Sequence, residues 1–207
     1  MAEKNLEMER LVFFSDAIVA IAITLLALDL KIDKTTSGHF LFKDLLEAKH
    51  NFAAFILSFF IIAAFWKVHH EFFHYIKKID GKLLWNNIGW LLFIVMLPFS
   101  SSLVSEYFYD KAPHFIYSTN VLMITIFQNN IWDYASAKYL HIKEDTDYEI
   151  IRSYRIACNV AMVNAILAML LSLIYPVAAF IILLLRLPMI LFANRYKYRG
   201  RKPLIKR

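Results

Sequence analysis

The chain has 207 residues, of which 59% are hydrophobic, and its mean hydropathy is +0.50. Soluble domains are less apolar than this, so the composition excludes an ordinary soluble protein and indicates an integral membrane protein. In such a chain, the formal charge of +6 reports orientation in the membrane rather than nucleic-acid binding. The single cysteine, Cys158, excludes a disulfide framework or a metal–thiolate cluster.

Hydrophobic segments predict six membrane-spanning helices, and hence an all-α, polytopic fold. Each is close to the length needed to cross the hydrocarbon core of a bilayer. We expect a single domain over residues 1–207, ending in a basic tail at 195–207. The expected spans are 11–30, 52–76, 83–104, 115–137, 153–174 and 177–193.

The distribution of lysine and arginine predicts the orientation of these spans. Most basic residues fall on one side if the amino terminus is cytoplasmic, so we expect both termini in the cytoplasm. The tail, which ends Arg201-Lys202-Pro-Leu-Ile-Lys206-Arg207, is interpreted as a topology anchor or as a contact for anionic lipid headgroups.

One face of the first span carries a regular stripe when residues are placed at 100° intervals, made of Ala17, Ile21, Thr24 and Leu28. Arg10 lies below the stripe near the same azimuth, whereas Ser15 and Asp16 fall away from it. From periodicity alone, packing against lipid or another helix is the favoured interpretation of this stripe.

Asp16 needs hydrogen-bond donors, because an ionisable group at membrane depth is costly. Donors at the same level are Trp66, His70 and His74 in the second span and Trp85, Asn86, Asn87 and Trp90 in the third. The His70/His74 pair has no recognisable third ligand, so it does not predict a metal site.

These residues resemble the signature of the transmembrane protein 175 family. The motif is Arg10-x-x-x-Phe14-Ser15-Asp16, followed by Ala-Ile-x-Ala-Ile-x-Ile-Thr-Leu-Leu. The Trp66-x-x-x-His70 segment, the Trp85/Asn86 pair and Pro98-Phe99 also fit the resemblance, which extends over the whole chain.

The resemblance implies a potassium channel whose central pore is lined by the first helix. Animal members resemble two fused six-helix repeats that work as dimers, so a single-repeat chain implies a homotetramer. Ile21 and Leu28 would then form aliphatic rings, with Thr24 as a polar ring for potassium and Ala17 on the same face. The helical stripe brings these positions together independently of the resemblance.

The resemblance also implies a structural polar network that holds the first three helices together without touching ions. Its expected members are Arg10, Phe14, Ser15, Asp16, Trp66, His70 and Asn86.

The chain has no Thr-Val-Gly-Tyr-Gly sequence, so we expect no re-entrant filter loop of the ordinary potassium-channel kind. Selection would come from dehydration at the aliphatic rings, with Thr24 oxygens replacing some water. Such a filter predicts a modest preference for K⁺ over Na⁺, and the same rings would act as a hydrophobic gate. We expect no cofactor, bound metal or nucleic-acid partner.

Two other function classes stay open. A proton- or cation-coupled transporter would use Asp16 and His70 as a proton relay, and a scaffold would conduct nothing. Ser15 lacks an oxyanion site, so an enzyme is not expected. The plasma membrane of a prokaryote is the expected location.

Overall fold

The computed structural model describes residues 2–30, 42–137 and 141–184, and these ranges are helical apart from short connections. They contain no strand, only an isolated bridge between Ile76 and Ile142. The helices are α1 (Ala2–Leu26), α2 (Phe42–Glu47), α3 (Lys49–Tyr75), α4 (Gly81–Glu106), α5 (Lys111–Ser136), α6 (Tyr148–Ser172) and α7 (Pro176–Leu184), with a 3-10 turn, η1 (Ala27–Asp29), after α1.

Each of the six expected spans overlaps one helix, namely α1, α3, α4, α5, α6 or α7. Of the described helices, α3, α4 and α6 are long and apolar enough to cross a membrane by length and composition. α1 is charged in its first half, and α5 contains buried polar residues such as Asn120 and Gln128. The second half of the last expected span, and the basic tail at 195–207, lie outside the described residues.

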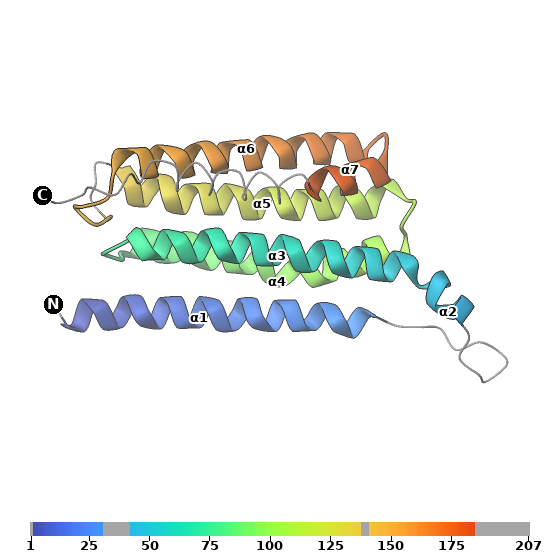
Figure 1. The fold of residues 1–207 in the computed structure, drawn as a ribbon, viewed down its shortest axis with the longest axis horizontal. Coiled ribbons are helices and arrows are strands. Elements are labelled where there is room, and N and C mark those ends of the chain that lie inside the picture. Colours follow the sequence, from blue (N-terminus) through green and yellow to red (C-terminus); the bar gives the residue numbers. More distant parts are fainter. Residues whose placement is uncertain (1, 31–41, 138–140, 185–207) are drawn as a thin grey trace, which may run out of the picture.

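The helices lie side by side in a layered bundle (Figure 1). α1 runs along one side and packs against α4 and α3, which form the middle of the bundle. α5, α6 and α7 form the opposite side, where α5 packs against both α4 and α6. This arrangement leaves the outer side of α1 uncovered by the described part of the chain.

Aromatic side chains join α3, α5 and α6. The ring of Phe72 stacks on Trp132 with 4.5 Å between centroids, and Tyr154 meets the edge of Trp132 at 5.1 Å. The indole N–H of Trp132 donates to the carbonyl of Ile151 over 3.1 Å, so the buried ring keeps its hydrogen bond.

The connections that follow α3 and α5 meet at one end of the bundle. Besides the bridge at Ile76, the backbone N–H of Lys77 donates to the carbonyl of His141 at 2.7 Å, and its ammonium pairs with Glu144 at 2.8 Å. Asp80 caps α4 by accepting from the N–H of Leu83 at 2.8 Å. These contacts tie the α3–α4 connection to the α5–α6 connection.

Candidate functional site

The side of α1 that faces the bundle is defined by one narrow stripe of buried side chains. Its members recur every three or four residues, as expected for one face of a helix, and are Leu11, Ser15, Val19, Ala22 and Leu26. Apart from Ser15 they are apolar, so α1 is held to the bundle mainly by burial of this stripe.

The residues expected to line a pore lie on the opposite side of α1 and, for Leu28, in the 3-10 turn η1 that continues it. Ala17 and Thr24 are exposed, and the exposed fractions of Ile21 and Leu28 are 59% and 69%. All four lie on one uncovered face, as the sequence predicts. Such exposure fits a pore between subunits and equally fits contact with lipid, so exposure alone does not assign the face.

The hydroxyl of Thr24 has a defined orientation. It donates to the carbonyl of Ile21, one turn earlier in α1, over 2.8 Å. Because a hydroxyl has one proton and two lone pairs, this bond leaves the Thr24 oxygen as an acceptor on the exposed face. An oxygen in this state can replace a water molecule around a cation.

A chain of buried hydrogen bonds joins α1, α4 and α3 behind this face. The amide nitrogen of Asn87 donates to Ser15 Oγ at 2.9 Å, and Ser15 donates to the carbonyl of Leu11 at 2.8 Å. The Asn87 carbonyl oxygen therefore accepts from Nε2–H of His69, 2.7 Å away. His69 in turn stacks on Trp90 with 4.1 Å between ring centroids.

A second link joins α1 to α3 nearer the surface. The indole N–H of Trp66 donates to the Asp16 carboxylate at 2.8 Å. The ring of His70 lies beside Trp66, with 5.5 Å between centroids. Asp16 thus receives one of the donors that its position in the helix requires.

The structure gathers part of the expected network and replaces two of its members. Ser15, Asp16 and Trp66 take part, whereas Asn86 donates within α4 to the carbonyl of Lys82 at 3.1 Å. His70 is exposed, as are Arg10 and Phe14. The buried chain of hydrogen bonds instead contains their neighbours Asn87 and His69.

A signal for these two residues exists in the sequence. Asn87 occupies a helical stripe whose other members are large and apolar, such as Leu83 and Trp90, and His69 occupies the equivalent stripe between Phe65 and Phe72. A polar residue inside such a stripe is buried and must be hydrogen-bonded. Asn86 and His70 each lie one residue, or 100°, away from it.

The family model of the endosomal/lysosomal potassium channel TMEM175 matches residues 10–98, which contain most of α1, all of α3 and the network just described. A potassium channel of Chamaesiphon minutus is 31% identical over 140 residues, covering 65% of this chain and 69% of that protein. The chain belongs to the TMEM175 family.

Other relatives agree with membership of the TMEM175 family. A potassium channel of Streptomyces collinus is 32% identical over 61% of this chain, and the match spans less than two thirds of that protein, 63%. The crystal structure of a lysosomal potassium-selective TMEM175 homologue from Chamaesiphon minutus superimposes with a TM-score of 0.80 at 26% identity. It covers 91% of this chain and 98% of that one.

Family membership confirms the resemblance and the all-α, polytopic membrane fold inferred from the sequence. The relatives carry the names of channels, which agrees with the expectation that the chain is not an enzyme. Among the residues that the structure describes, no group of three or more His, Cys, Asp or Glu side chains is arranged to hold a metal ion.

Proposed function

We propose that the chain forms a potassium-preferring cation channel, in which α1 of four identical subunits lines a central pore. The observation that carries the proposal is the uncovered face of α1 and η1, where Ile21, Thr24 and Leu28 lie opposite the buried stripe. The relatives' names as potassium channels support this reading of the face.

Ions cross the proposed pore by losing part of their hydration shell. Ile21 and Leu28 form aliphatic rings that exclude water, and the Thr24 oxygens form an acceptor ring between them. K⁺ sheds water more cheaply than Na⁺, so a site with few oxygen ligands prefers K⁺ modestly. A narrow aliphatic ring also dewets, so one of the two rings serves as the gate.

The buried hydrogen bonds position α1 in this proposal. Ser15, Asn87 and His69 fix its rotation about its own axis from one side, and the bond from Trp66 to Asp16 fixes it from another. A change of rotation would turn the aliphatic rings away from the axis of the pore. The proposed assembly is a single-domain homotetramer in a prokaryotic plasma membrane, with both termini cytoplasmic.

The alternative of a proton relay through Asp16 and His70 is not favoured. Trp66 lies beside both residues, and its N–H is the group that bonds Asp16. An indole N–H donates but does not pass on a proton at physiological pH. A relay also predicts saturating flux that depends on Asp16, whereas a pore predicts flux proportional to the driving force.

Flux into liposomes tests the channel proposal. Purified wild type is compared with Ile21→Ala and Leu28→Ala under K⁺ or Na⁺ gradients, with Ile116→Ala, an exposed position on α5, as the matched control. We expect wild type to pass K⁺ faster than Na⁺, the α1 variants to conduct more and select less, and the control to match wild type. Silence of every protein, or equal flux in all of them, would overturn the proposal.

A further inference from the structure

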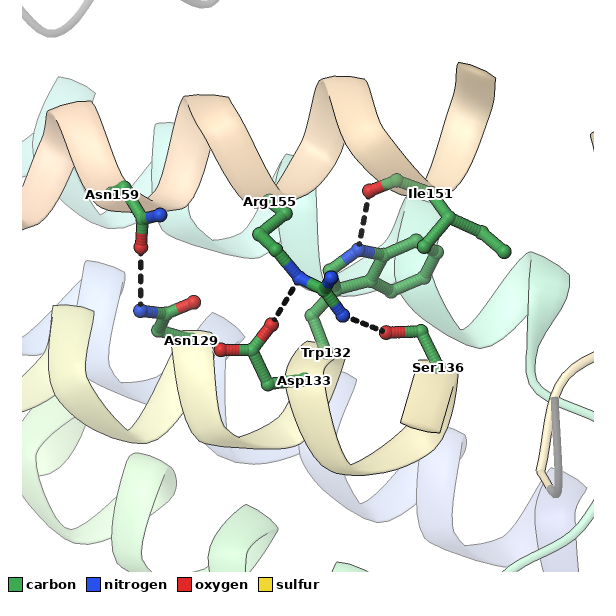
Figure 2. A network of polar contacts seen from close by, with 7 residues as sticks. All are labelled: Asn129, Trp132, Asp133, Ser136, Ile151, Arg155 and Asn159. Atoms are coloured by element: carbon green, nitrogen blue, oxygen red, sulfur yellow. Dashed lines mark hydrogen bonds and ion pairs between the residues drawn. The ribbon is translucent and has the colours of Figure 1, made fainter. Parts of the chain in front are cut away.

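A group of polar side chains links α5 to α6 on the side of the bundle away from α1, and Figure 2 shows it at close range. We call it the α5–α6 polar patch; its members are Asn129, Asp133, Ser136, Arg155 and Asn159.

The patch contains an ion pair and, next to it, a hydrogen-bonded pair of asparagine side chains. The guanidinium of Arg155 donates through Nε to Asp133 at 2.7 Å and through Nη2 to Ser136 at 3.2 Å. The amide nitrogen of Asn129 donates to the carbonyl oxygen of Asn159 at 3.1 Å. The patch therefore presents a carboxylate and a guanidinium side by side.

The position of the patch suits the headgroup level of a bilayer. The side chains of Asp133 and Arg155 are each 45% exposed, on two helices of a membrane-embedded bundle. Tyr134, the next residue along, bonds to Asp80 directly before α4, so this level is the end of the bundle and not its middle. Half-exposed charges are tolerated at such a level because they contact headgroups.

Some hydrogen-bonding groups of the patch have no partner among the described residues. Asn129 is only 8% exposed, and its carbonyl oxygen has no hydrogen-bond partner among the described residues. Figure 2 shows that oxygen turned away from Asn159, toward the side on which Asp133 lies. A buried acceptor without a donor is costly, so a ligand that brings N–H groups would stabilise it. Arg155 has five N–H donors, and its bonds to Asp133 and Ser136 use only part of them among the described residues.

We propose that the α5–α6 polar patch binds the headgroup of a phosphatidylethanolamine lipid. The primary ammonium donates to the Asn129 carbonyl oxygen and the Asp133 carboxylate, and the lipid phosphate accepts from Arg155. Phosphatidylcholine has no N–H donor and therefore leaves Asn129 unpaired. The proposal does not depend on ion conduction.

Thermal unfolding of the detergent-purified full chain, with added lipid, tests this site. Binding at about tenfold the dissociation constant is expected to raise Tm by about 3–5 °C. We expect that shift with phosphatidylethanolamine and a clearly smaller one with phosphatidylcholine or phosphatidylglycerol. Equal Tm shifts with the three lipids would overturn the proposal. Equal shifts are also the result expected if a second copy of the protein, and not a lipid, covered the patch.

Variants of two adjacent asparagines locate the effect. Asn129→Leu is expected to abolish the preference for ethanolamine, whereas Asn130→Leu, the same change at an exposed neighbouring position, is expected to keep it. The proposal would be contradicted if Asn129→Leu retained the preference for ethanolamine, or if both variants lost it equally. If Asn129→Leu fails to fold, Asn129→Asp provides the test instead. The new carboxylate still accepts from an ammonium, so the proposal requires this variant to keep the preference for phosphatidylethanolamine.

Discussion

At the scale of single residues, two neighbouring asparagines in α4 have different roles. Asn87 is fully buried and bridges Ser15 to His69. Within the part of the chain that the structure describes, Asn86 bonds only to the backbone of its own helix. Replacement of Asn87 by leucine leaves the buried Nε2–H of His69 without an acceptor. We expect Asn87→Leu to lower the free energy of unfolding by about 1–3 kcal/mol.

Asn86→Leu is the matched control for this prediction. It removes only an i−4 bond to Lys82, so its effect is expected to stay within about 0.5 kcal/mol. Denaturant or thermal unfolding in detergent measures both variants. If Asn86→Leu proved the more damaging, the buried chain through Asn87 would not be what holds α1.

The hydroxyl of Thr24 supports a second prediction at this scale, which rests on the proposed channel. Thr24→Val keeps the shape of the side chain but removes the acceptor oxygen, and Thr24→Ser keeps the oxygen. We expect the ratio of K⁺ to Na⁺ flux to fall in Thr24→Val and to be retained in Thr24→Ser. Equal ratios in the two variants would remove Thr24 from the selectivity mechanism.

At the scale of helices, the packing of α4 on α5 depends on one glycine. A Cβ atom built on Gly89 would lie 2.4 Å from a ring carbon of Phe127, closer than real contacts allow. We expect Gly89→Ala to destabilise the protein by about 1–3 kcal/mol through overpacking, measured by thermal unfolding. Among the described residues, no atom outside the adjacent backbone lies within 4 Å of a Cβ built on Gly81, so Gly81→Ala should be neutral or slightly stabilising.

A double variant separates overpacking from other effects of Gly89→Ala. Phe127→Leu removes the ring that the new methyl group would meet, so the two changes together should cost less than the sum of the single changes. Additive costs would show that the close approach of Gly89 to Phe127 is not the cause.

At the scale of the whole molecule, Asp80 helps to join the α3–α4 connection to the α5–α6 hairpin. Its carboxylate accepts from Leu83 N–H and from the Tyr134 hydroxyl, and lies 3.6 Å from His141. Burial acts to raise the pKa of Asp80, but these hydrogen bonds and His141 outweigh it and hold the pKa below its usual value of 3.8.

A pKa that is lowered by folding stabilises the folded state above the unfolded value, and this stabilisation disappears as the pH falls through the folded value. We therefore expect the Tm of wild type to drop as the pH falls below about 4, and Asp80→Asn to lose part of that dependence. Thermal unfolding between pH 7 and pH 2 measures this. Identical pH profiles of the two proteins would show that Asp80 contributes no pH-dependent stability.

The sequence by itself was sufficient for the class of protein, the helical segments and the composition of the α1 face. Hydrophobic length decides where a membrane helix can lie, and the 100° interval between residues places Ala17, Ile21, Thr24 and Leu28 together in any α-helix. The Arg10-to-Asp16 motif and the segments that accompany it indicated the family. None of these inferences needs a contact between distant parts of the chain.

Only the tertiary structure decided which polar residues meet behind that face. Asn86 and Asn87, like His69 and His70, differ by 100° around their helices, and the rotation of α3 and α4 depends on how all the helices pack. Large apolar side chains bury the stripes that contain Asn87 and His69, and Ser15 of α1 then lies within reach. The α5–α6 polar patch likewise exists only because residues 129–136 and 155–159 pack side by side.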